Sequence, residues 1–110
     1  YKAIPIKVPG TKNFYIESNS IEKSMGWLVS FWMMLDFGEK SKKNDPTLSM
    51  RSHIDANCKT LEWRTNYDAF FSKPFAKGEP LEVNKNLSEW FEIEKGSALS
   101  SVIKFACSKE

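Results

Sequence analysis

The sequence predicts an α+β fold, in which a single antiparallel sheet of about five or six strands carries a C-terminal helix on one face. Two observations support this prediction. Three stretches between residues 26 and 71 alternate apolar and polar side chains with the period of two that is typical of half-buried strands. After Gly96 and Ser97, the apolar residues switch to the period of a helix.

The first predicted strand lies near residue 13, where a short aromatic and β-branched run is followed by the turn-forming residues 18–20. Residues 26–38 form the clearest strand, because Val29, Phe31 and Met33 share one face. The opposite face also carries Trp32 and Met34, so this strand should be central, with something covering part of its second side.

A polar loop over residues 39–47 should connect this strand to the next one. Residues 48–58 and 59–71 again alternate, which predicts two more strands with Cys58 at or beside the turn between them. In the second of them, Trp63, Thr65 and Tyr67 should share a face. Residues 72–80 form a predicted loop, and residues 81–84 could add a short strand.

The C-terminal helix should begin after Ser97, a plausible N-cap. Its apolar stripe consists of Leu99, Val102, Ile103 and Ala106. A helix of about ten residues is marginal alone in water, so we expect the stripe to dock on the apolar side of the sheet.

Cys107 lies close to the buried stripe of this helix, four residues beyond Ile103. We therefore predict a disulfide between Cys58 and Cys107, which would tether the helix to the sheet and indicate an oxidising compartment. Two unpaired buried cysteines are the alternative, because two cysteines in a chain do not prove a pair.

Composition limits the classes of function. The 110 residues fit one domain over residues 1–110, and 41% hydrophobic with 14% aromatic residues excludes a disordered chain. The net charge of only +2, with far more lysine than arginine among the basic residues, argues against a nucleic-acid partner.

The sequence contains no apolar run near the roughly 20 residues that span a bilayer. The chain opens at Tyr1 without an apolar targeting segment, as expected after removal of an export signal.

Several segments together resemble the surface-adhesin protein E family of bacterial envelope proteins. The resemblance covers most of the chain and depends on the order and spacing of its parts. These parts are "YIESNSI" (15–21), "FWMMLDF" (31–37), "SMRSHIDANC" (49–58), Arg64, Tyr67, Trp90, Ile93, Gly96, Ser97 and Cys107.

The resemblance implies an exported protein, located in the periplasm or on the cell surface, with an antiparallel sheet and a disulfide-tethered C-terminal helix. It also implies non-enzymatic binding, without a cofactor, to a protein ligand such as an extracellular matrix protein. Family members can dimerise, so a homodimer is a further expectation. A structural envelope component that associates only with itself is the alternative function.

Two groups of basic residues are candidates for partner binding. Lys40, Lys42 and Lys43 form a basic loop that could steer an acidic partner, although such a run is more often solvated surface. Arg51 and Arg64 lie on the polar faces of neighbouring predicted strands and could recognise a partner, since arginine is enriched at interface centres. A merely solvated sheet face is the alternative for these two residues.

Enzymatic and metal sites have weaker support in the sequence. His53 and Asp55 could form half of an acid–base pair for a small redox or hydrolytic enzyme, but no nucleophile can be placed beside them. Cys58, Cys107 and His53 lack the short spacings of a zinc site. We therefore expect neither catalytic nor metal-binding residues.

Overall fold

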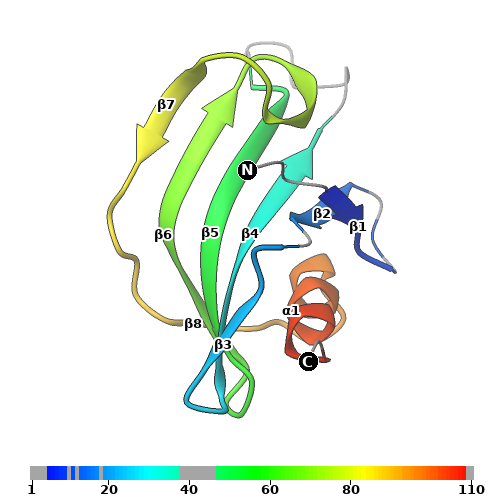
Figure 1. The fold of residues 1–110 in the computed structure, drawn as a ribbon, viewed down its shortest axis with the longest axis vertical. Coiled ribbons are helices and arrows are strands. Elements are labelled where there is room, and N and C mark those ends of the chain that lie inside the picture. Colours follow the sequence, from blue (N-terminus) through cyan, green and yellow to red (C-terminus); the bar gives the residue numbers. More distant parts are fainter. Residues whose placement is uncertain (1–4, 10, 12, 18, 38–46, 109–110) are drawn as a thin grey trace.

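The computed structural model describes residues 5–9, 11, 13–17, 19–37 and 47–108. Its main feature is an antiparallel sheet with the strand order β1-β2-β4-β5-β6-β7, in which β3 also pairs with β4 and β8 with β6. A single helix in this part of the chain, α1, lies against one face of the sheet (Figure 1). The strands are β1 (Pro5–Lys7), β2 (Phe14–Glu17), β3 (Glu22–Ser24), β4 (Leu28–Asp36), β5 (Ser49–Asn57), β6 (Glu62–Phe71), β7 (Pro80–Asn84) and β8 (Phe91–Glu92).

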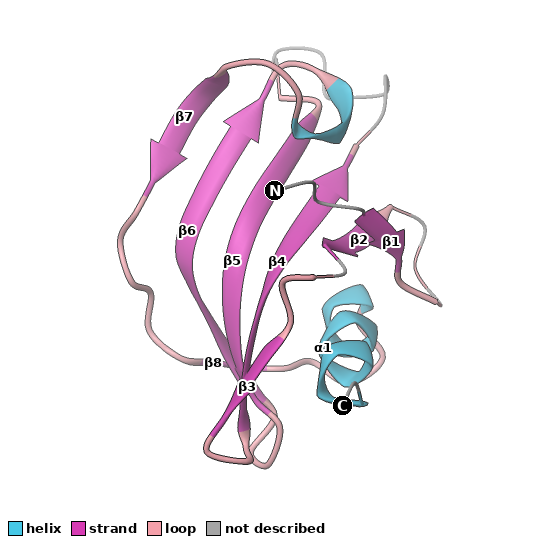
Figure 2. Ribbon diagram, viewed as in Figure 1, coloured by secondary structure: helices cyan, strands magenta, loops and turns pink. Residues whose placement is uncertain are grey.

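The predicted fold class is confirmed, but the predicted strand number is wrong. The described residues form eight strands instead of five or six (Figure 2). The strands that the sequence did not reveal, β1, β3 and β8, have only two or three residues each, too few to show an alternating pattern. The short strand predicted at residues 81–84 is confirmed as β7. Most of the predicted loop at 39–47 lies outside the described residues.

The central strand β4 pairs with β5 along its whole length, from Leu28 opposite Asn57 to Asp36 opposite Ser49. Its second face is partly covered, as predicted, by the short 3-10 turn η1 (Pro74–Ala76). The ring of Phe75 lies 5.5 Å from that of Tyr15, and the amide of Ala76 donates a hydrogen bond of 2.8 Å to Ser49 Oγ.

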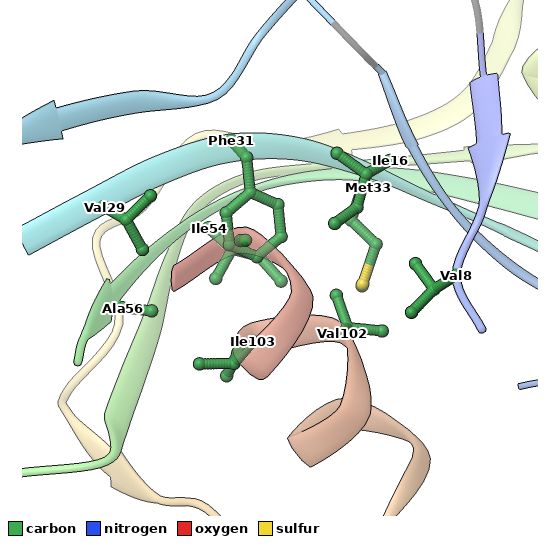
Figure 3. Close-up of a cluster of buried hydrophobic side chains, with 10 residues drawn as sticks. Val8, Ile16, Val29, Phe31, Met33, Ile54, Ala56, Val102 and Ile103 are labelled. Atoms are coloured by element: carbon green, nitrogen blue, oxygen red, sulfur yellow. The ribbon is translucent and has the colours of Figure 1, made fainter. Parts of the chain in front are cut away.

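The hydrophobic core lies between the sheet and α1 (Ala98–Ser108) (Figure 3). Three helix residues of the predicted stripe are fully buried, namely Val102, Ile103 and Ala106. They pack against fully buried side chains of the sheet, which include Ile16, Val29, Phe31, Ile54 and Ala56, and against Val8, which directly follows β1. The predicted N-cap is confirmed, because the amide of Ser100 donates a hydrogen bond of 3.2 Å to Ser97 Oγ.

A disulfide joins Cys58 to Cys107, with 6.0 Å between the two Cα atoms. The pairing predicted from the sequence is therefore confirmed, and the alternative of two unpaired cysteines is wrong. Cys58 lies in the turn between β5 and β6, as predicted, and Cys107 in the last turn of α1. The bond thus fixes the end of the helix to one rim of the sheet.

One part of the predicted alternation in β6 is wrong. The pairing of β5 with β6 shifts between His53, opposite Tyr67, and Ile54, opposite Thr65, so that Asn66 is an extra residue in a β-bulge. After the bulge the two faces exchange. Tyr67 turns away from the helix side, and Asp68 turns toward it, where it accepts a hydrogen bond of 2.5 Å from Ser52 Oγ.

Candidate functional site

The face of the sheet opposite α1 carries a cluster of charged, polar and aromatic side chains, which we call the polar face. Alternation along the central strands directs these side chains away from the helix. They come from β4, β5 and β6, which are adjacent in the sheet. The polar face consists of Ser30, Trp32, Arg51, His53, Asp55, Arg64, Asn66 and Tyr67.

Arg51 is held by a carboxylate and an aromatic ring together. Its Nε and Nη2 atoms lie 2.6 and 3.0 Å from the two carboxylate oxygens of Glu17. Its Cζ atom lies 3.8 Å from the centre of the Trp32 ring. Because Glu17 is only 4% exposed, the two-point ion pair is shielded from solvent on one side and fixes the guanidinium firmly.

Asp55 is the centre of a second network. It is 7% exposed, and its Oδ1 accepts a hydrogen bond of 2.7 Å from Ser30 Oγ. Its Oδ2 accepts hydrogen bonds from Arg64 Nε at 3.0 Å and from Asn66 Nδ2 at 3.3 Å. The guanidinium of Arg64 also lies over the ring of Trp90, with 4.5 Å between Cζ and the ring centre. Both arginines therefore combine a carboxylate with a tryptophan.

His53 connects the two networks. Its ring lies 4.8 Å from that of Trp32, and Tyr67 contacts the same tryptophan at 5.2 Å. His53 Nδ1 lies 2.9 Å from Asn66 Oδ1. His53 therefore shares its hydrogen bond with the side-chain amide of Asn66. The Asp55 carboxylate instead accepts hydrogen bonds from Ser30, Arg64 and Asn66. No hydrogen bond joins His53 to Asp55, so the acid–base pair that the sequence left open as an alternative is not formed.

The polar face includes two of the five residues that the sequence predicted for partner binding. Arg51 and Arg64 lie on this face as expected. Lys40, Lys42 and Lys43 lie outside the described residues. Whether any of these five residues binds a partner stays a prediction.

Sequence reasoning missed Glu17 and the position of Trp90. Glu17 is 34 positions from Arg51, and only the pairing of β2 with β4 brings it close to β5. In the sequence, Trp90 stands out only as part of the family resemblance, yet the structure places it 37% exposed beside Arg64.

No three His, Cys, Asp or Glu side chains of the described residues gather closely enough to hold a metal ion. Both cysteines considered as zinc ligands are bonded to each other. In the part of the chain that the structure describes, no helix has the length and apolar character needed to cross a membrane.

Comparison with known proteins identifies related chains. A family model described as surface-adhesin protein E matches residues 4–108. Crystal form II of Haemophilus influenzae protein E superposes with a TM-score of 0.73 at 16% identity, covering 94% of this chain and 87% of that chain. The selenomethionine form from the same organism gives a TM-score of 0.71 at 17% identity, covering 94% and 85%. These structures show that the fold is shared. No curated protein sequence matches the chain significantly.

Proposed function

Because the chain belongs to the surface-adhesin protein E family, we propose that it is an exported, non-enzymatic binding module that attaches a bacterial envelope to a protein partner. Residues 1–110 form one such domain in this proposal. The partner is an extracellular matrix protein or another protein at the host surface, and the module acts at the cell surface rather than within the periplasm. The polar face is the surface that contacts the partner.

The pairing of each arginine with a tryptophan is the observation that supports this surface most directly. Arg51 lies over Trp32 and Arg64 over Trp90, at 3.8 and 4.5 Å. Arginine and tryptophan are enriched among the residues that dominate binding energies at protein interfaces. Neither arginine is fully covered, since the side chains of Arg51 and Arg64 are 31% and 27% exposed.

The internal partners of these arginines favour binding because they reduce its entropic cost. An arginine that is free in solution loses side-chain freedom when a partner immobilises it, roughly 0.5–1.5 kcal/mol for a rotamer-rich side chain. Glu17 and Asp55 already hold the two guanidinium groups in place. Their remaining N–H groups can then donate to a partner from fixed positions.

The basic residues Lys40, Lys42 and Lys43 have a different role in the proposal. They would raise the rate of association with an acidic partner, whereas the polar face would determine how slowly the complex dissociates. Charge reversal at the three lysines should therefore slow association, and should do so more strongly at low ionic strength than at high ionic strength.

The proposed contact surface can be tested with arginine-to-lysine changes, which keep the charge but lose the two-point pairing and the ring stacking. We expect Arg51→Lys combined with Arg64→Lys to weaken binding to immobilised fibronectin or collagen by at least about tenfold, the loss of roughly one hot-spot contact. Surface plasmon resonance would measure the affinity, and circular dichroism would check that the fold is intact.

Lys77→Arg combined with Lys85→Arg provides the matched control, because both residues are exposed and belong to neither network. This control should bind like the unmodified protein. An unchanged affinity in the arginine-to-lysine variant would remove the polar face from the proposal. A lack of binding by every variant and by the unmodified protein would argue against these matrix proteins as partners.

A self-associating envelope component is the second candidate function. It is favoured by β7, which is the last strand on its side of the sheet and in which all five residues are exposed. Such an edge can pair with a second chain to form a homodimer. Light scattering distinguishes the two candidates, because self-association alone gives a mass that rises with concentration and no affinity for a foreign protein.

A further inference from the structure

A pocket with an apolar floor lies beside α1, where the turn between β5 and β6 meets the segment that leads into the helix. We call it the helix pocket. Its volume is about 310 Å³. It is lined by Leu61, Ile93, Lys95, Gly96, Ser100, Ile103 and Lys104. None of these residues belongs to the polar face, so the two surfaces are separate.

The floor of the helix pocket includes an apolar side chain in a strained position. Leu61 has a φ of 59°, a conformation that residues with a side chain adopt uncommonly. Two backbone hydrogen bonds hold it there: its amide donates to the Asn57 carbonyl at 2.9 Å, and its carbonyl accepts from the Ile93 amide at 3.0 Å. Although α1 is close, the leucine remains 43% exposed. Strained residues of this kind concentrate at functional sites.

The rim of the helix pocket is basic. Lys95 and Lys104 are both exposed, and neither forms an ion pair with a described residue. Among the described residues that line the pocket, none is acidic. The polar wall residue Ser100 already donates its hydroxyl to the Ser97 carbonyl at 2.7 Å. The two ammonium groups are therefore the charged groups that a ligand would meet.

We propose that the helix pocket binds a free medium-chain fatty acid. Its alkyl chain would cover the apolar side chains of Leu61 and Ile93, and its carboxylate would lie between Lys95 and Lys104. The volume is at the lower end of the roughly 300–1,000 Å³ of small-molecule pockets, which favours one short chain over a two-chain lipid. This inference does not depend on the proposed function.

Titration with decanoate at monomeric concentrations tests the inference on the full oxidised chain. Amide NMR shifts should change at Leu61, Gly96 and Ser100 and should saturate. Decanol has the same chain without the charge and should bind several-fold more weakly. Lys95→Gln combined with Lys104→Gln should weaken decanoate binding about fivefold, as expected for the loss of two exposed charge contacts. Lys77→Gln combined with Lys85→Gln removes the same charge elsewhere and should have no effect.

Leu61→Gly is the sharpest variant. Glycine adopts a positive φ without strain, so the thermal midpoint of unfolding should change little. Decanoate binding should nevertheless weaken about tenfold, because part of the apolar floor is lost.

Three results would each overturn the inference: decanoate binding by Leu61→Gly equal to that of the unmodified protein, equal binding of decanol and decanoate, or no binding of decanoate. Sedimentation with phosphatidylglycerol vesicles, without binding of decanoate, would indicate a membrane lipid and would also overturn it.

Discussion

On the α1 side of β4, Val29 and Phe31 are enclosed by apolar contacts with the helix, whereas on the opposite side Ser30 and Trp32 meet charged and polar partners. The apolar packing on the helix side depends on the volume that is filled and the area that is buried. It does not require the groups to point in particular directions. The opposite side depends on directed hydrogen bonds and ring contacts from Glu17, Arg51 and Asp55. The same strand therefore contributes to stability on one side and to the position of individual groups on the other.

This difference shows how one sheet can serve two purposes. Burial on the helix side supplies most of the free energy of folding. The polar face contributes less to stability, so it can keep two guanidinium groups and the Trp32 ring only partly buried. Changes on the two faces should accordingly differ in size, and the following predictions test that expectation from the largest effect to the smallest.

Phe31→Ala tests the helix side. The ring of Phe31 is fully buried, and we expect its removal to lower the free energy of unfolding by roughly 3–5 kcal/mol, from lost transfer energy and the remaining cavity. Urea-induced unfolding would measure the change. Trp32→Ala is the matched control on the other face of the same strand, where we expect only about 1–2 kcal/mol. Equal losses at the two positions would contradict the difference between the faces.

The disulfide is the next largest contribution. Replacing both Cys58 and Cys107 with alanine opens a covalent loop whose ends are 49 positions apart, which should cost about 4 kcal/mol in the chain-entropy description. The unmodified protein in reducing buffer should unfold at the same urea concentration as this variant. If the variant keeps the full stability of the oxidised protein, the helix is held by burial alone.

Arg51→Ala tests the polar face. It leaves the Glu17 carboxylate, which is 4% exposed, without its partner, and we expect a cost of about 2 kcal/mol. The partial exposure of Arg51 keeps this value below that of a fully buried pair. Adding Glu17→Gln should recover about 1 kcal/mol, because the unpaired charge is then absent. The free energy of unfolding would be measured for the unmodified protein, the two single variants and the double variant. Strictly additive losses would show that Arg51 and Glu17 are not coupled.

Much of the fold could be predicted because its signals are local. The alternation along β4 and β5 predicted the sheet, and the spacing of the apolar residues from Leu99 to Ala106 predicted the helix. Cys58 could be placed at a turn because both flanking strands alternate. The disulfide followed, since the helix needed to dock on the sheet and carried Cys107 near its buried stripe.

The rest depends on contacts that no local pattern encodes. The bulge at Asn66 exchanges the faces of Tyr67 and Asp68, and one inserted residue leaves no mark on the composition of a strand. The partner of Arg51 comes from β2, a strand of four residues. For the polar face, the sequence therefore indicated Arg51 and Arg64 but not what holds them.

The disulfide also determines how the module responds to mechanical tension. Residues between Cys58 and Cys107 form a covalently closed loop, and pulling on the chain cannot lengthen that loop while the bond is intact. A force applied beyond Cys107 would pass directly through the sulfur atoms to the turn after β5. Strands β6, β7 and β8, all inside the loop, would be bypassed by the force. A module under mechanical load would benefit from this path.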